Sequence, residues 1–353
     1  MKTKRHGKLL VRAKDRKIAK QRFWCNDCNR SFLFKKDNER LSPAKKRTLA
    51  RQYLEGRSSY RVLARLHNLS KTTILKTVLE IISDLASPEV IAALLAPKWS
   101  GILSVDGKYI RTFDWSVEHS RLTARERRFA HKTVLLAGID VLTKDIPYSR
   151  LGDEETVIDL VMFFQGLKRV NYDLRVLVTD GNPDIVRAAR KVYGEDFEHQ
   201  LCHKHFLDTL KLYAKDENEE NRADTEQLIE IIGKALKKSH YVEFWGRTET
   251  QVKIVKYYEK KYPKLSVWIK NPNVPRTNNH IENLFRQFNL RLKTVNIFRC
   301  YQNTEKYLNA LILSRRFTKF ECCRGRNKMK NGKAPLELAG CNIQGLDYLK
   351  KLD

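Results

Sequence analysis

The stretch LRVLVTDGNPD, residues 174 to 184, indicates the fold of this chain most directly. Its apolar and β-branched residues predict a short strand that carries Asp180 to the edge of a sheet, just before a turn that contains glycine. Three similar stretches precede it: ILSVDGKYIRTF from Ile102, KTVLLAGIDVLT from Lys132 and IPYSRLG from Ile146. The sequence therefore predicts four strands in this region.

Helical patterns surround these strands. DEETVIDLVMFFQGLKR, residues 153 to 169, is an amphipathic segment that begins with acids and ends with bases, as the helix macrodipole prefers. Three strands, this helix and a further strand predict an α/β fold with a mixed sheet flanked by helices. Beyond them come NPDIVRAARKVY, a short strand HQLC and a long helical region, rich in lysine and glutamate, from about residue 204 to 270.

The N-terminal segment, residues 1–40, is basic and has one distinct motif. FWCNDCNRSF holds Cys25 and Cys28 in a C-x-x-C arrangement, which supplies two of the four ligands of a tetrahedral zinc site. The motif therefore fits either zinc binding or a metal-free remnant of a partial zinc ribbon. In both cases the basic and aromatic residues of the segment suit contact with DNA.

Residues 42–86 predict an all-α unit with helix-turn-helix spacing. SPAKKRTLARQYLEG has a serine N-cap, a proline in the first turn and Gly56 as its terminator, and SSYRVLARLH and KTTILKTVLEIISDL follow. In such a unit the last helix enters the major groove of DNA, so its early residues would face bases and phosphates. These residues are Lys71, Thr72, Thr73 and Lys76. The alternative is a small helical bundle with a solvated basic face.

Composition points to nucleic acid as the partner. The 353 residues include 69 lysines and arginines against 41 acids, a formal charge of +28. A basic surface attracts nucleic acid because binding releases condensed counterions. The sequence has no apolar run of roughly 20 residues, the length of a spanning helix, so we expect double-stranded DNA and no membrane as partner. Seven sparse cysteines indicate a reducing, cytoplasmic compartment.

RTNNHIENLFRQFNLRLKT, residues 276 to 294, places a single acid, Glu282, among arginines and lysines. At about 100° per residue its apolar side chains form one stripe, so this helix packs firmly against the protein. The opposite side carries Glu282, Arg286, Asn289 and Lys293. A solvated face with an ordinary glutamate–arginine pair would explain this pattern. The polar opening favours a functional site, because Asn278 and Asn279 can cap the helix and present amides beside the acid.

Four motifs, SVDGKY, LVTDGNPD, LCHKH and RTNNHIENLFRQFNLRLK, resemble in that order the DDE transposases of bacterial and archaeal insertion sequences, closest to the Mutator-like and IS256-like group. The resemblance covers about residues 97–315 and implies an RNase H-like catalytic domain. It assigns Asp106, Asp180 and Glu282 as a catalytic acidic triad that holds two magnesium or manganese ions. The 102 residues from the second acid to the third imply an inserted helical domain at about residues 206–275.

The resemblance also implies roles for residues around the triad. Three basic residues would hold the DNA backbone beside the acids: Arg286, Arg291 and Lys293. Trp245 would stack on transposon DNA, although a lone tryptophan in a helix is more often part of the core. Cys202 and His205 have the C-x-x-H spacing of Mutator-like transposases, which fits either a buried structural pair or metal ligands.

Together these features predict a transposase that binds the ends of an insertion sequence, cuts DNA and transfers the strand to a target. Synapsis of two terminal inverted repeats predicts a homodimer or larger assembly, associated with the nucleoid of a prokaryote. Two alternatives stay open: a transposase-derived DNA-binding regulator without catalysis, and an RNase H-like nuclease or resolvase that cuts without joining. The presence of all three acids favours an enzyme. Residues 316–353 predict a basic C-terminal tail.

Overall fold

The structure is a computed structural model, and it describes residues 3–13, 16–26, 30–33, 41–56, 58–112, 131–153, 155–238, 241–295 and 301–351. The chain divides into two compact units, Met1–Lys46 and Arg47–Asp353. Within the described ranges, every helix is too short or too polar to cross a membrane.

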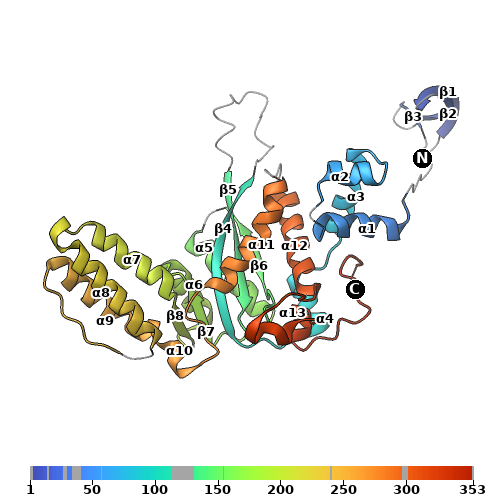
Figure 1. Ribbon diagram of the computed structural model, residues 1–353. Coiled ribbons are helices and arrows are strands. Elements are labelled where there is room, and N and C mark those ends of the chain that lie inside the picture. The colour runs from blue at the N-terminus through green and yellow to red at the C-terminus, as the bar shows by residue number, and fades with distance from the viewer. Residues whose placement is uncertain are drawn as a thin grey trace. The chain divides into compact units, whose positions relative to one another are not determined.

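The first unit contains a three-stranded antiparallel sheet (Figure 1). Its strands, in spatial order, are β1 (Thr3–Ala13), β2 (Arg16–Cys25) and β3 (Ser31–Leu33). The register of β1 shifts between Arg5 and Lys8, where Gly7 has a φ of +65°. Glycine adopts this left-handed conformation without steric cost. The sequence suggested a basic segment with a partial zinc ribbon here and predicted no individual strands, so the three strands are an addition to the prediction.

Four helices follow, and a serine side chain caps each of them; at the first, Ser42 Oγ accepts from the backbone N–H of Lys45 at 3.3 Å. The helices are α1 (Pro43–Leu54), α2 (Tyr60–Leu66), α3 (Lys71–Ser83) and α4 (Pro88–Leu95). The hydroxyls of Ser59, Ser70 and Ser87 accept hydrogen bonds from backbone N–H groups at 3.3, 3.0 and 3.4 Å. Each bond satisfies a donor that the first turn of a helix leaves unpaired. α2 and α3 pack against each other, and the helices predicted here are confirmed.

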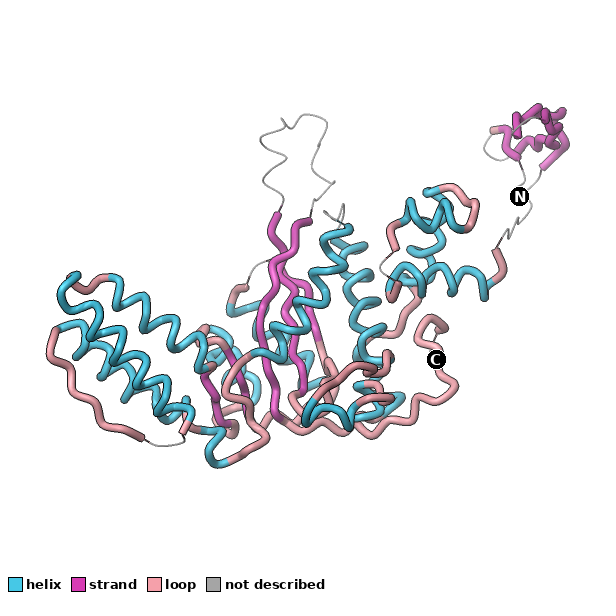
Figure 2. Tube along the Cα trace, viewed as in Figure 1, coloured by secondary structure: helices cyan, strands magenta, loops and turns pink. Residues whose placement is uncertain are grey.

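A five-stranded mixed sheet forms the centre of the second unit, in the order β6-β5-β4-β7-β8 (Figure 2). The strands are β4 (Ile102–Thr112), β5 (His131–Asp140), β6 (Ser149–Gly152), β7 (Val176–Thr179) and β8 (Glu198–Leu201). β5 is antiparallel to β4 and β6, whereas β7 is parallel to β4 and β8. The predicted strands and the mixed α/β sheet flanked by helices are confirmed.

The two faces of the sheet pack against different helices. These helices are α5 (Val157–Arg169), α6 (Pro183–Tyr193), α11 (Asn279–Val295) and α12 (Tyr301–Phe317). Leu103 and Val105 are buried in a core with apolar residues of α5 and α6. Ile102 points the other way, because side chains alternate along a strand, and it packs with Val178 and Val274. α11 contacts β4 and β5.

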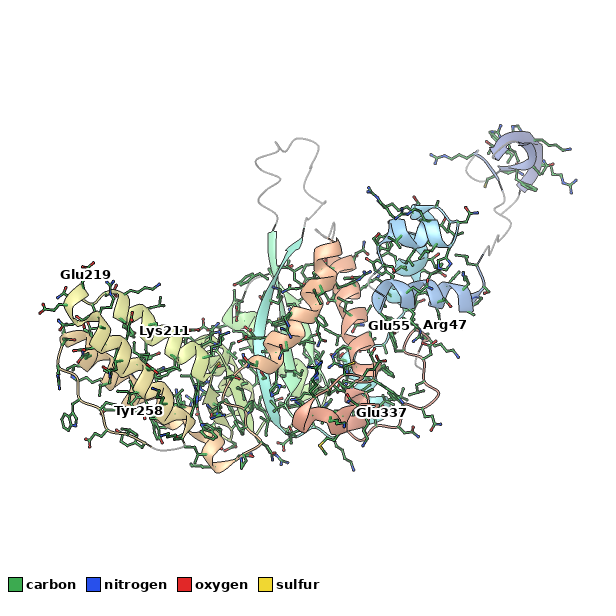
Figure 3. All side chains as sticks on the ribbon, in the orientation of Figure 1. Arg47, Glu55, Lys211, Glu219, Tyr258 and Glu337 are labelled. Atoms are coloured by element: carbon green, nitrogen blue, oxygen red, sulfur yellow. The ribbon has the colours of Figure 1, made fainter. Side chains whose placement is uncertain are left out.

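Between β8 and α11 the chain forms a group of helices with its own core. They are α7 (His203–Lys215), α8 (Glu219–Lys237), α9 (Glu249–Leu265) and α10 (Val267–Lys270). α7, α8 and α9 run side by side, and Phe206, Ile232 and Tyr258 are buried among them (Figures 1 and 3). This group occupies the region in which the sequence predicts a helical insertion.

The C-terminal segment is folded, which corrects the expected basic tail. After α12 come a 3₁₀ helix, η3 (Gly325–Lys330), and α13 (Pro335–Leu338). Leu336 and Tyr348 are buried, and the Tyr348 hydroxyl donates to Glu55 Oε1 at 2.7 Å. The segment has no long periodic pattern, so its sequence suggested a tail. Contacts with distant parts of the chain decide its burial.

Candidate active site

Asp106 lies on β4, and Asp180 directly follows the neighbouring parallel strand β7. β4 and β7 pair so that Ser104 lies opposite Val178, and each acid follows its strand residue by two positions. Residues two apart on a strand share one face, so both carboxylates project from the same side of the sheet. Neighbouring strands are about 4.8 Å apart. The register therefore brings these two predicted acids side by side.

Burial and nearby carboxylates raise the pKa of Asp106 from 3.8 to about 7. Burial is the largest cause, and the charges of Asp180, Glu155 and Glu282 act in the same direction. The backbone N–H of Gly107 donates to Asp106 Oδ1 at 2.8 Å and opposes the shift. Glu282, which is distant in sequence, makes the smallest of these contributions to the pKa of Asp106.

A buried asparagine fixes the start of α11 beside Asp106. Asn278 Nδ2 donates to the carbonyl of Val105 at 3.1 Å, and its Oδ1 accepts from the Ser104 hydroxyl. The backbone N–H of Asn278 donates to the sulfur of Cys202 at 3.3 Å. The side-chain amide is thus satisfied at both ends inside the protein. These bonds join β4 and the start of α7 to α11, and they place Glu282 one turn into the helix.

Lys204 of α7 pairs with Glu282, and His205 of the same helix lies nearby. Lys204 Nζ lies 3.3 Å from Glu282 Oε2, and His205 Nε2 lies 3.9 Å from Oε1. Glu282 Oε1 is buried and accepts no hydrogen bond within the described residues. A buried oxygen without a donor is unfavourable unless a ligand supplies the missing interaction. The C-x-x-H spacing therefore separates two roles: buried Cys202 supports Asn278, while His205 faces the acid.

Glu155 is a fourth carboxylate at this edge of the sheet, and the sequence prediction missed it. A Cβ atom at Gly107 would lie 3.0 Å from Glu155 Oε2, so the absence of a side chain there makes room for this acid. Asn182 Nδ2 donates to Glu155 Oε1 at 3.2 Å, and its backbone N–H donates to Asp180 Oδ1 at 3.0 Å. Asn182 thus links the two acids. The acidic residues before α5 could have pointed to Glu155 as a site residue. They were attributed instead to the helix macrodipole, which favours acids at the start of a helix.

The carboxylates have the donor chemistry of a site for divalent cations. Mg²⁺ prefers carboxylate oxygens and water, and a cation relieves the repulsion between adjacent carboxylates. The buried, unpartnered Oε1 of Glu282 is a donor available to such an ion. As they stand, no three His, Cys, Asp or Glu side chains in the described part of the chain are gathered closely enough to hold one. The other oxygen of Glu282, Oε2, is paired with Lys204 Nζ at 3.3 Å.

Most of the predicted DNA contacts are at the surface. Four of them are exposed on helices: Lys71, Thr72, Lys76 and Arg286. Thr73 is partly exposed and donates its backbone N–H to Ser70 Oγ at 3.0 Å. Trp245 is 81% exposed ahead of α9, so it is not a core residue. Asn279 is exposed at the start of α11, and the side chain of Lys293 lies outside the described residues.

The prediction that Arg291 contacts DNA is wrong, because its side chain is buried. Its Nε donates to the Tyr307 hydroxyl at 2.9 Å, and its terminal nitrogens donate to the carbonyl of Ser58 at 3.3 Å. The guanidinium also lies over the Tyr53 ring, 3.9 Å from its centroid. A planar guanidinium suits this combination of hydrogen bonds and stacking. Arg291 therefore fastens α11 to α12 and to the helices before the sheet.

The predicted zinc ligands are only partly described. Cys25 is buried at the end of β2, and its backbone N–H donates to the carbonyl of Arg30 at 3.0 Å. Cys28 lies outside the described residues. Zinc binding by this pair stays a prediction.

We expect Asp106→Asn to stabilise the metal-free protein at high pH. The folded protein holds a proton on Asp106 up to about pH 7, whereas the unfolded chain releases it near pH 3.8, so wild-type stability falls as pH rises through this window. Asparagine does not ionise, so the variant does not lose stability in this way. Above pH 7 the loss in the wild type amounts to about 1 to 3 kcal/mol of the free energy of unfolding. Urea unfolding in EDTA at pH 5 and pH 8 measures the effect. If the difference in the free energy of unfolding between the two proteins does not widen from pH 5 to pH 8, the prediction is contradicted.

Asn278→Ala should lower the free energy of unfolding by about 1 to 3 kcal/mol, because a buried hydroxyl and a buried carbonyl lose their partner. Asn279→Ala removes the same amide from the neighbouring exposed position and serves as the matched control. Equal stability of the two variants would show that Asn278 does not anchor the helix.

Comparison with protein-family models gives no match for this chain. Comparison with curated proteins gives no significant match.

Proposed function

We propose that this chain is a DDE transposase of an insertion sequence, with the mixed sheet as the core of an RNase H-like catalytic domain. One observation carries the proposal: Asp106 on β4 lies near Asp180, the residue directly after the neighbouring parallel strand β7, and the charges of both Asp180 and Glu282 raise the pKa of Asp106. Asn278 supports it, because a buried network that fixes the start of α11 beside β4 is suited to positioning a catalytic acid.

In this proposal Asp106, Asp180 and Glu282 hold Mg²⁺ or Mn²⁺. Two such ions stabilise the attacking and the leaving oxygen of an in-line phosphoryl transfer. Exposed Arg286 and Lys204, on either side of Glu282, bind phosphates of the DNA backbone and position the scissile bond. Water attacks the scissile phosphorus and adds to the 5′-phosphate, while the 3′-oxygen leaves and takes up a proton. That 3′-hydroxyl then gives up its proton and attacks a phosphorus of target DNA, and the P–O bond to the target's own 3′-oxygen breaks, so this oxygen leaves as a 3′-hydroxyl.

The helices before the sheet would recognise the ends of the element. α2 and α3 pack as a pair, and the first turn of α3 exposes Lys71, Thr72 and Lys76. This arrangement suits a helix-turn-helix unit that places α3 in the major groove. Exposed Trp245 would stack on an unpaired base of an opened end. Synapsis of two ends implies a dimer or larger assembly, acting on the nucleoid in the cytoplasm of a prokaryote.

Strand cleavage and joining test the proposal directly. The substrates are labelled duplexes taken from both flanks of the gene that encodes the chain, with a supercoiled plasmid as target and Mg²⁺ or Mn²⁺ as cofactor. We expect cut ends joined to the plasmid, and no products with Glu282→Gln. Cutting without joining would instead identify an RNase H-like nuclease or resolvase. Specific binding without cutting by the wild-type protein would identify a DNA-binding regulator.

A further inference from the structure

A basic pocket lies across α11 from Glu282. It has a volume of about 260 Å³ and opens between the turn after β5, α11, the end of α12 and η3. Its basic lining residues are Lys144, His280, Arg315, Arg324 and Lys330. The described residues that line it include no acid. His280 and Glu282 lie two positions apart on a helix and so about 200° apart around it, which separates the pocket from the carboxylates.

The basic side chains of this pocket crowd each other. Lys144 Nζ lies 3.1 Å from His280 Nδ1. Burial, and then the charge and close contact of Lys330, lower the pKa of Lys144 to about 7. Burial, and then both lysines, lower the pKa of His280 to about 3. Like charges repel more strongly where water is excluded, so an anion between them would relieve an unfavourable arrangement.

The fold holds Lys144 in this arrangement. Its backbone has a left-handed φ of 62°, which is uncommon for a residue with a side chain. Asp140 fixes the same turn, because its Oδ1 accepts from the backbone N–H and hydroxyl of Thr143 at 3.0 and 2.8 Å. Asp140 favours the charged form of Lys144, but its other oxygen already accepts from Ser100 and from Tyr172. Its bonding capacity is therefore largely used, and the Lys144 ammonium donates instead to the carbonyl of Val141.

We propose that this pocket binds a phosphate group. Lysine and arginine donors that converge on a small space suit the oxygens of phosphate. Pockets for drug-sized ligands are typically about 300 to 1,000 Å³, so this smaller one suits a single phosphate better than a whole nucleotide. The phosphate belongs either to a DNA backbone or to a free phosphate ion. The proposal does not depend on catalysis by the carboxylates.

Inorganic phosphate tests the pocket without DNA. NMR of the full-length protein with labelled lysine side chains follows the titration of Lys144 in chloride buffer and after addition of phosphate. Bound phosphate should raise the pKa of Lys144 by at least about one unit, because a nearby anion favours the charged form. Lys330→Gln should weaken this response. Lys328→Gln, which removes the same charge from an exposed position of η3 outside the pocket, should leave it unchanged.

Binding of duplex DNA tests whether the phosphate in the pocket belongs to a DNA backbone. Lys330→Gln should weaken binding of a short duplex by about tenfold, the effect of 1.4 kcal/mol, and lower the salt slope by about one unit relative to Lys328→Gln. A response to phosphate alone assigns the pocket to the free ion, and an effect on duplex binding assigns it to the DNA backbone. If Lys144 does not respond to phosphate and the two glutamine variants bind DNA equally, the proposal is overturned. The carboxylate variants do not affect these measurements, so the two proposals fail separately.

Discussion

Asp180→Asn is expected to lower metal-dependent DNA cleavage by at least about 1,000-fold while the protein remains folded. The reason lies in the register of β4 and β7, which sets Asp180 beside Asp106. A neutral amide removes a charge that a divalent cation needs, and stabilisation by such an ion is worth several kcal/mol in the transition state. Asparagine keeps the size of the side chain, so packing should change little. Initial rates of duplex cleavage in Mg²⁺ measure the effect.

Asp173→Asn is the matched control for this experiment. It makes the same substitution before the opposite end of β7, where Asp173 pairs with Arg175 at the surface. Its cleavage rate should match that of the wild type within about twofold, because surface changes rarely exceed 0.5 kcal/mol. Full activity in Asp180→Asn, or equal losses in the two variants, would remove the catalytic assignment.

Arg316→Leu is expected to lower the free energy of unfolding by about 3 to 5 kcal/mol. Arg316 on α12 is buried against Asp145 in the turn after β5, with Nε–Oδ1 and Nη2–Oδ2 distances of 2.8 and 2.9 Å. Trp99 Nε1 also donates to Asp145, at 2.9 Å. Removing the arginine leaves a buried carboxylate without its counter-charge, and this loss is the source of the large effect. Urea unfolding at neutral pH measures it.

Arg175→Leu provides the comparison that isolates burial. Arg175 pairs with Asp173 at 2.8 Å, the same distance, but both side chains are more than two-thirds exposed. Water screens this pair, so its loss should cost at most about 1 kcal/mol. If the two leucine variants were equally stable, the Arg316 pair would not be the contact that holds α12 and the segment after it to the sheet.

The sequence alone was sufficient for the five-stranded sheet and most of the helices, but not for the three strands of the first unit, and it singled out three acids whose catalytic role stays a prediction. The strands and helices have local signals: β-branched runs ended by Gly, Asp or Pro, serine caps, and an apolar stripe on residues 279–295 whose described members are largely buried. Asp106, Asp180 and Glu282 could be selected because each stands out from its surroundings, at a strand end or within a basic helix. Such signals involve neighbours in the chain, so they can be read without a structure.

Only the tertiary structure decided which side chains are buried and what they meet. Arg286 and Arg291 have similar sequence surroundings. Arg286 is nevertheless exposed, whereas the guanidinium of Arg291 lies over the Tyr53 ring. Glu155 joins the acids only because Gly107, distant in sequence, leaves room for it. After residue 315, Arg316 pairs with Asp145 and the Tyr348 hydroxyl donates to Glu55, contacts that join residues far apart in sequence. Burial and charge pairing depend on residues that are distant in sequence, whereas periodicity records only the local face of each element.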